Sequence, residues 1–153
     1  MAVSTYTSSV WEKFPPKSPH IANTTVQGKM QWTAAGTVGD VLFLARVPHG
    51  ARIIDFAEYH SNGQTAAAIS FGFDRGIASG GAGNKSCLIA SGAVATMNRF
   101  SFATAPSGIP IQISLSDTDP LRYATLVGLA ESGTFTISVS VTFSLTYSMD
   151  AAG

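Results

Sequence analysis

The chain has 153 residues, enough for one domain with a substantial core but not comfortably for two. Its formal net charge is zero and its nine Lys and Arg are scattered, so nucleic-acid binding has little support. Charged residues make up only 12%, about half the usual share, which favours a protein packed against others over a solitary monomer. The alternative is an ordinary β domain with a hydroxyl-rich exterior.

The cysteine count, the N-terminal sequence and the length of the apolar runs indicate the cellular compartment of the protein. The single cysteine, Cys87, excludes an intrachain disulfide framework. The polar start Met1–Val10 has no apolar core, so we expect no signal peptide, and no uninterrupted apolar run approaches membrane-spanning length. These features predict a protein made and used in a cytoplasm or released from one by lysis.

The first stretch, Met1–Thr25, is predicted to be an extended N-terminal arm that precedes the domain at residues 26–153. Pro15, Pro16 and Pro19 fix backbone dihedrals and remove amide donors, which favours an extended or polyproline-like path. Large apolar residues are unusual in a purely disordered tail, so we expect them to be buried against a neighbouring subunit or, alternatively, against their own domain. The candidate contact residues are Val10, Trp11, Phe14, Pro15 and Pro16.

From Val26 onward, short apolar runs alternate with turns, which is typical of strands. Pro48-His49-Gly50 is a turn in which Pro presets its dihedral and Gly can take a positive one, and we expect the strands on either side to be antiparallel. The Asn62-Gly63 pair predicts a tight hairpin. The predicted strands before the C-terminal region are Val26–Thr33, Asp40–Val47, Ala51–Tyr59, Ala66–Asp74, Arg99–Thr104, Ile109–Leu115 and Arg122–Ala130.

Two stretches in the middle of the chain are less regular. Arg75–Asn84 contains four glycines and predicts a flexible surface loop, since it lacks the Gly-Lys-Ser/Thr ending of a phosphate-binding loop. Lys85–Met97 fits either one short helix or a strand and turn. Pro110 lacks an amide donor, so the strand at Ile109–Leu115 should begin at a sheet edge.

The most regular stretch is Thr134–Tyr147, where apolar and hydroxyl residues alternate as they do on a strand with one apolar face. It carries no charge and would invite aggregation as a bare sheet edge. We therefore predict that it pairs on both sides, with another protomer as one source of a partner strand. Its apolar face comprises Phe135, Ile137, Val139, Val141, Phe143, Leu145 and Tyr147.

The connection into this strand is predicted to be a hairpin. Opposed residues of an antiparallel pair lie on the same face, so a loop at residues 131–133 sets Leu129 opposite Phe135 and keeps both in the core. Gly133 then takes the left-handed position of such a loop. Eight or nine strands with little helix predict an all-β fold, a jelly-roll or β-sandwich with an extended N-terminal arm; a closed barrel is the alternative.

No group of residues in the sequence predicts catalysis, a cofactor or a metal centre. The three histidines lack metal-ligand spacing. Asp117 and Asp119 could supply oxygen ligands to calcium, although Asp also starts turns, which is the interpretation we favour. Cys87 has no neighbouring His to activate it and is expected to be a buried structural thiol. The absence of a nucleophile-elbow pattern is mild evidence against an enzyme.

One segment carries a resemblance to a known family. Gly39–Asp55, which contains Val47-Pro48-His49-Gly50-Ala51, is similar to the strand, Pro-x-Gly-Ala, strand opening of tailed-bacteriophage head decoration (cement) proteins, which have a jelly-roll fold. The likeness continues through Ala66–Asp74 and returns at Gly133–Tyr147, which resembles their long final strand. The glycine-rich loop and the N-terminal arm have no clear counterpart.

The resemblance implies a subunit that forms a homotrimer on the outer surface of a phage capsid. Its expected partner is the major capsid protein, its location the virion, and its place of synthesis the host cytoplasm; no cofactor, nucleic acid or membrane is expected. Two alternatives stay open: another virion subunit of the same fold, such as a tail or fibre-base component, and a carbohydrate-binding or hydrolytic jelly roll. The candidate glycan-binding aromatics are Trp32, Tyr59 and Tyr123.

Overall fold

The computed structural model describes residues 4–11, 23–32, 35–61, 68–77, 82–93, 98–101, 111–116, 118, 119, 121–133, 135 and 139–149. This part of the chain contains nine strands and no helix, hence no helix long and apolar enough to cross a membrane. The strands are β1 (Thr5–Thr7), β2 (Asn23–Gln31), β3 (Val41–Pro48), β4 (Ala51–Ser61), β5 (Ala68–Arg75), β6 (Ala82–Ala93), β7 (Asn98–Ser101), β8 (Tyr123–Ser132) and β9 (Ser140–Met149). The predicted all-β fold is confirmed.

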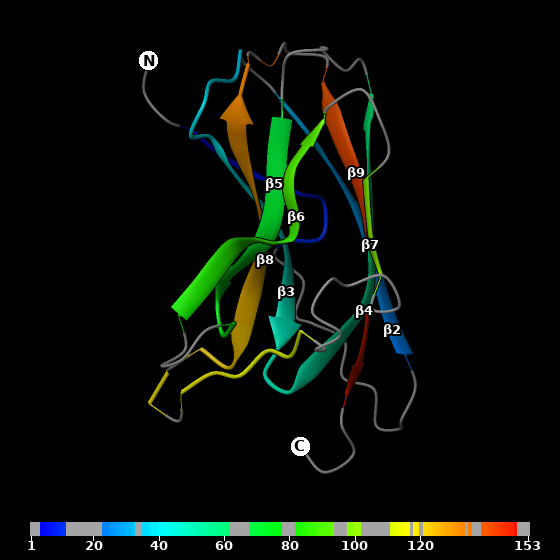
Figure 1. Cartoon of the computed structure of the whole chain (residues 1–153), viewed down its shortest axis with the longest axis vertical. Coiled ribbons are helices and arrows are strands. Elements are labelled where there is room, and N and C mark those ends of the chain that lie inside the picture. The colour runs from blue at the N-terminus through cyan, green and yellow to red at the C-terminus, as the bar shows by residue number, and fades with distance from the viewer. Residues whose placement is uncertain are drawn as a thin grey trace.

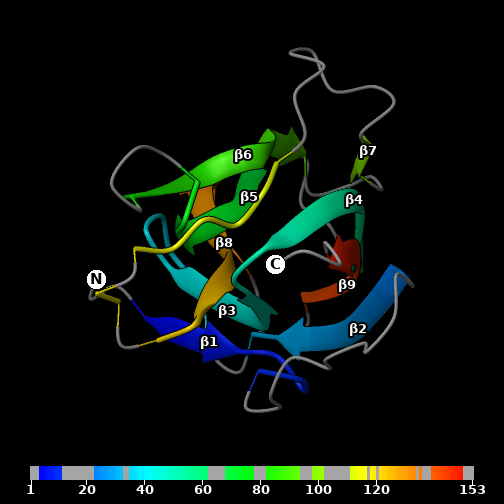
Figure 2. The ribbon, with the colours of Figure 1, turned by 90° about the horizontal axis from the view of Figure 1, so that it is seen from below.

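The strands form two sheets that lie face to face around one core (Figures 1 and 2). The first sheet has the order β1-β3-β8-β5-β6 and the second the order β2-β9-β4-β7. Antiparallel pairs nest within one another along the chain: β5 with β6, β4 with β7, β3 with β8, and β2 with β9. A long hairpin rolled up into two four-stranded sheets has this order, which is the jelly-roll topology. Strand β1 is additional to it and pairs in parallel with β3.

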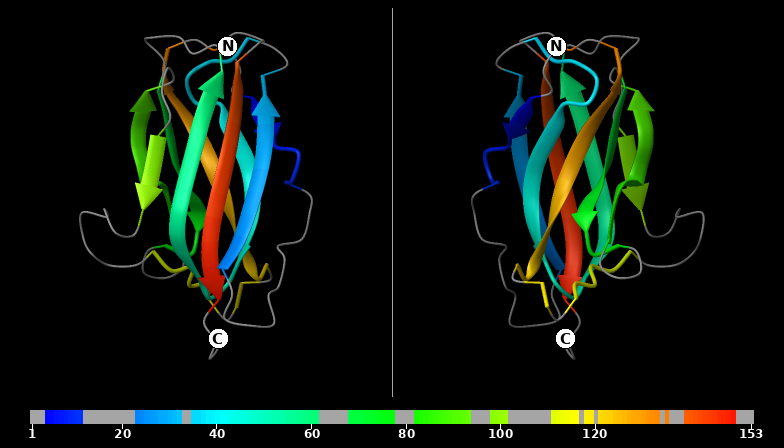
Figure 3. Two further views of the ribbon diagram at one scale, coloured as in Figure 1. Left: turned by 90° about the vertical axis from the view of Figure 1, so that its right-hand side faces the viewer. Right: turned by 90° about the vertical axis from the view of Figure 1, so that its left-hand side faces the viewer.

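Strand β9 lies inside the four-stranded sheet between β2 and β4, as the left view of Figure 3 shows. It pairs with β2 along the whole of β2 and with β4 on its other side, so both partner strands come from the same chain. Thr142 is exposed on the outer face, as the alternation predicts. Strand β9 begins at Ser140, and residues 134 and 136–138 of the predicted strand lie outside the described residues. Four inward side chains of this strand are buried, and Met149 at its end is half-buried against the core; the four are Val141, Phe143, Leu145 and Tyr147.

The hairpin predicted between β8 and β9 is wrong, because the two strands belong to different sheets. Leu129 pairs with Val41 of β3 and with Ser70 of β5, whereas Phe135 forms an isolated bridge with Gly36. Alternation specifies which face of a strand is buried but not which strand lies beside it. Since the two sheets share one core, the apolar faces of β8 and β9 meet through the core instead of pairing edge to edge.

The other predicted turns also connect the two sheets. Gly50 and Gly133 both have positive φ, 86° and 80°, as their turn positions predicted. However, β3 and β4 do not pair with each other, and the antiparallel neighbour of β3 is β8. The Asn62-Gly63 pair lies outside the described residues, and it connects β4 and β5, which are in different sheets, so the predicted hairpin is wrong.

The less regular middle of the chain is mostly strand. The stretch that fitted either helix or strand lies largely in β6, which begins at Ala82, within the predicted glycine-rich loop. The predicted strand Ile109–Leu115 keeps its alternation in the described part, with Ile113 and Leu115 buried. It is attached to the start of β4 by hydrogen bonds from Ile53 to Ile111 (2.8 Å) and from Ile113 to Ala51 (2.9 Å), but it extends neither sheet.

A bulge in β3 changes which residues face outward. The register with β8 shifts between Phe43 and Ala45, so Leu44 is inserted as an extra residue. Leu44 and Ala45 are both buried although they are adjacent, and Phe43 and Arg46 are only half-buried. The bulge therefore places Phe43 and Arg46 on the outer face of the five-stranded sheet, where the N-terminal residues lie.

Candidate interaction site

The predicted contact residues Val10 and Trp11 lie on the chain's own domain, while Phe14, Pro15 and Pro16 lie outside the described residues. Val10 packs against the core, and its Cγ2 lies near Gly28 of β2. We call residues 4–11 the N-terminal segment. Part of the predicted arm is thus strand β1 of the sheet, and β2 begins at Asn23, before the predicted end of the arm. Contact with a neighbouring subunit stays a prediction.

Backbone hydrogen bonds hold the N-terminal segment to both sheets. The amide of Ser8 donates to the carbonyl of Phe43 in β3 (2.9 Å), and the amide of Ser9 donates to the carbonyl of Lys29 in β2 (3.0 Å). The Ser8 hydroxyl also donates to the carbonyl of Leu44. Because β3 and β2 are neighbouring strands of different sheets, the segment bridges the seam between the sheets, as Figure 2 shows for β1.

A buried carboxylate anchors the beginning of the segment. Asp40 is fully buried, and its oxygens accept hydrogen bonds from the amide of Ser4 (2.8 Å), the amide of Thr37 (2.9 Å) and the indole of Trp32 (3.4 Å). The Trp32 ring in turn stacks on Phe135 with centroids 4.6 Å apart. Hydrogen bonds to an ionised carboxylate are stronger than neutral ones, so Asp40 joins the segment, a loop and the core.

The end of the segment covers a cluster of aromatic and arginine side chains on the outer face of the five-stranded sheet. The Trp11 ring stacks on Phe43 with centroids 5.0 Å apart. The Arg46 guanidinium lies 4.9 Å from the Trp11 centroid and 4.9 Å from the Tyr123 centroid, so it sits against both rings. All four side chains are half-buried. We call these four residues the Trp11 cluster; Trp, Tyr and Arg are enriched at the energetic centres of protein interfaces.

The candidate glycan-binding aromatics do not gather in one place. Trp32 is fully buried in the core. Tyr59 is 56% exposed on β4 in the four-stranded sheet, whereas Tyr123 is half-buried on β8 in the other sheet. The sandwich therefore does not present the three rings as one platform.

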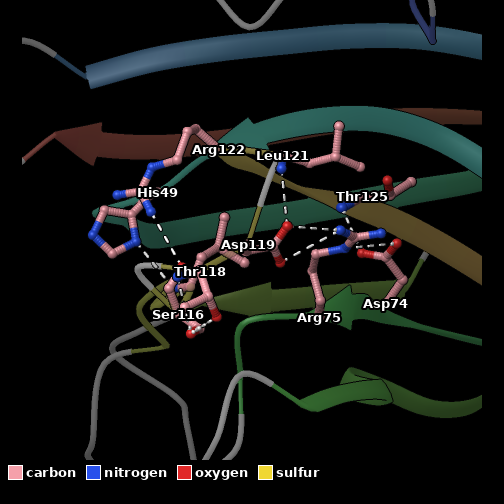
Figure 4. A network of polar contacts seen from close by, with 10 residues as sticks. His49, Asp74, Arg75, Ser116, Thr118, Asp119, Leu121, Arg122 and Thr125 are labelled. Carbon is pink, nitrogen blue, oxygen red and sulfur yellow. Dashed lines mark hydrogen bonds and ion pairs between the residues drawn. The ribbon is translucent and has the colours of Figure 1, made fainter.

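Of the two acidic residues considered for calcium, Asp117 lies outside the described residues and Asp119 takes part in a structural network (Figure 4). Asp119 accepts a hydrogen bond from the amide of Leu121 (2.9 Å), and its carboxylate forms an ion pair with Arg75 (3.3 Å). Arg75 also pairs with Asp74, whose other oxygen accepts from the amide of Thr125 (2.7 Å). The turn interpretation is confirmed for Asp119, and no cluster of His, Cys, Asp and Glu able to hold a metal is found among the described residues.

Comparisons with known proteins match this fold but not this sequence. No protein-family description and no curated protein matches the sequence. Among solved structures, a chain of the capsid of Ralstonia phage GP4 superposes with a TM-score of 0.70 at 13% identity, covering 95% of this chain and 98% of that chain. A chain of the cyanophage Pam1 capsid asymmetric unit gives a TM-score of 0.59 at 12% identity, covering 90% and 95%. The chain therefore shares its fold, over nearly its whole length, with chains of two phage capsids.

Proposed function

We propose that the protein is a structural component of a tailed-phage virion that binds the outer surface of the capsid as a homotrimer and stabilises it. The observation that carries the proposal is the likeness to chains of two phage capsids, which extends over almost the full length of the chains on both sides. The resemblance of Gly39–Asp55 to head decoration proteins agrees with it. The proposal assigns the chain a structural role and no catalytic one.

The chemistry of the surface supports a role in assembly. The outer face of β9 carries hydroxyl side chains, with Thr142, Ser144 and Thr146 in one row, and only 12% of the whole chain is charged. Such a face costs less to desolvate than a charged one, provided that its hydroxyls form hydrogen bonds to the partner. Each contact with a capsid subunit can then be weak, because a trimer that engages several subunits at once gains roughly 10²- to 10⁴-fold in avidity.

Cosedimentation with separated phage parts tests the proposal. Purified protein is mixed with heads that lack it and, separately, with tails, and bound protein is quantified after centrifugation. We expect saturable binding to heads and an increase in the temperature at which heads release DNA. Binding to tails alone would favour the alternative of a tail or fibre-base subunit, and binding to neither would contradict a virion role.

Light scattering over a range of concentrations tests the trimer. A stable mass of three chains is the expected result, that is, three times 15.9 kDa. A monomer at all concentrations would contradict the trimer, while the head-binding assay would still decide whether the protein decorates capsids.

A further inference from the structure

We propose that the N-terminal segment is exchanged between copies of this chain, so that residues 4–11 of one copy occupy the seam between the sheets of a neighbouring copy. The inference rests on the self-association part of the proposed function and adds the contact by which copies are joined. Two features of the structure support it. The domain carries all the groups that bind the segment, and the segment's strand β1 is additional to the eight-stranded jelly roll.

The receiving site is formed entirely by residues distant from the segment in sequence. Asp40 receives the Ser4 amide, the Phe43 carbonyl receives the Ser8 amide, and the Lys29 carbonyl receives the Ser9 amide. None of these three acceptors depends on which copy supplies the donor. Strand β1 has only three residues and joins the sheet at its edge, where the segment of another chain can pair in the same parallel register.

The hydrophobic contacts of the segment are likewise with distant residues. Trp11 contacts Phe43 and Arg46 of β3, and Tyr6 approaches Trp32 with ring centroids 5.7 Å apart. An exchanged segment therefore makes the same stacking and cation–π contacts as an unexchanged one. Exchange of an identical element is a route to oligomers that needs no new complementary surface.

The connection to β2 is long enough to permit exchange. Eleven residues, 12–22, lie between Trp11 and Asn23, so the chain can span up to about 40 Å between them. The span required within one copy is shorter: Ser9 bonds to Lys29, which is six residues along β2 from Asn23, or about 20 Å. The difference leaves about 20 Å for the segment to reach a neighbour.

The balance between the two arrangements depends on how close the copies are. A linker of this length keeps the segment at an effective concentration of roughly millimolar at its own site, so in dilute solution each copy fills its own seam. When copies are held side by side, a neighbour's segment is present at a comparable concentration, and exchange becomes competitive. Exchange therefore accompanies self-association and stabilises it.

Engineered disulfides can distinguish the two arrangements. Thr5 of β1 and Val41 of β3 are direct partners, so a Thr5→Cys, Val41→Cys pair in a Cys87→Ser background is close enough to bond. The matched control is Thr25→Cys with Thr146→Cys, also direct partners but both within the jelly roll. Both pairs are oxidised at low micromolar concentration and in the self-associated protein, and the products are resolved on non-reducing gels.

We expect the Thr5–Val41 pair to give monomers at low concentration and covalent dimers and trimers in the self-associated protein, while the control pair gives monomers in both. Monomers alone in a protein shown by light scattering to be self-associated, or no self-association at any concentration, would overturn the exchange. The head-binding assay separates this outcome from the proposed function. Oxidised monomer that still binds heads leaves decoration intact without exchange, whereas interchain bonds in a protein that binds no heads leave exchange intact without decoration.

Discussion

Strands β9 and β6 have similar lengths but are held in the molecule in different ways. β9 lies inside its sheet and pairs with β2 in one unbroken register. β6 is an edge strand, and its register with β5 shifts twice. Between the pairs Phe71–Ile89 and Phe73–Asn84, β5 has one residue, Gly72, and β6 has four.

This difference shows that regular alternation governs the pairing of β9 with β2, whereas close backbone approach governs the pairing of β6 with β5. A Cβ at Gly72 would lie 2.1 Å from the carbonyl oxygen of Asn84, and a Cβ at Gly83 would lie 2.1 Å from that of Asp74. Glycine is required where the bulged β6 backbone crosses β5. Bulges at an edge also obstruct pairing with another sheet. The irregularity of β6 therefore protects this edge strand from aggregation, whereas β9 lies inside its sheet and needs no such protection.

The strongest test of the centre is Phe143→Ala. Phe143 is buried on the inward face of β9, and its truncation leaves a cavity between the sheets. We expect the free energy of unfolding to fall by about 4 kcal/mol, measured by denaturant titration. The matched control is Thr142→Ala on the exposed outer face, expected to change stability by less than about 0.5 kcal/mol. Equal effects of the two substitutions would contradict the assignment of faces.

The edge is tested by Gly72→Ala. The added methyl group overlaps backbone atoms of β6, which cannot rotate away as a side chain can, so we expect a loss of about 3 kcal/mol. Gly50→Ala is the control for backbone conformation alone, because Gly50 has φ +86° and its nearest atom is 3.9 Å from the added Cβ. That variant should lose about 1 kcal/mol. If thermal unfolding showed a larger loss of stability for Gly50→Ala than for Gly72→Ala, β5 and β6 would be able to move apart at little cost. That result would contradict a need for glycine at position 72.

The opposite edge of the same sheet is tested by Trp11→Ala. The substitution removes the stack on Phe43 and the contact with Arg46, for an expected loss of about 1 to 2 kcal/mol. Hydrogen exchange of the Ser9 amide should also accelerate, since its bond to Lys29 depends on the segment staying in place. Tyr59→Ala removes an exposed ring from the other sheet and should leave both stability and this exchange rate unchanged. Unaltered exchange in Trp11→Ala would mean that the ring does not hold the segment.

The sequence-based predictions succeeded where local pattern is sufficient. The alternation of β9 and the burial of Ile69, Phe71 and Phe73 in β5 follow from side-chain parity within one strand. The positive φ of Gly50 and Gly133 follows from turn chemistry. Strand neighbours could not be predicted in this way, because β3 and β4, or β8 and β9, show the same apolar face whether they pair or oppose each other across the core.

The residues of the candidate site also divide into those that local sequence pattern marks and those that only the pairing of strands brings together. Val10 and Trp11 could be singled out because they are large apolar residues in a polar, proline-rich stretch. Arg46 could not, and Tyr123 was singled out only as a glycan-binding candidate. The two residues meet only through the register of β3 with β8, in which Pro48 opposes Tyr123 and places Arg46 diagonally from it. The bulge at Leu44 decides that Arg46 faces outward, and no local pattern around Leu44 marks an inserted residue.

The pH dependence of the free energy of unfolding compares a residue of the edge strand β6 with a residue of the central strand β9. The effect is confined to alkaline pH, so it contributes almost nothing to stability at neutral pH. Burial raises the pKa of Cys87, on β6, from 9.0 to about 11, and it raises the pKa of Tyr147, on β9, from 10.0 to about 12. In each case the unfolded chain loses its proton first, so stability is unaffected below the unfolded pKa and falls as pH rises toward the folded pKa. Cys87→Ser should remove the loss between pH 9 and 11, and Tyr147→Phe the loss between pH 10 and 12.

Thiol labelling gives the independent measurement at the edge. At pH 8, a pKa of about 11 leaves roughly a hundredfold less thiolate than a pKa of 9, so native Cys87 should react roughly a hundredfold more slowly than the unfolded chain. The native rate should then rise about tenfold per pH unit until near pH 11. A native rate that levels off near pH 9 would mean that the bulged edge opens often enough for Cys87 to titrate as an exposed thiol, and that β6 is held more loosely than its contacts with β5 indicate.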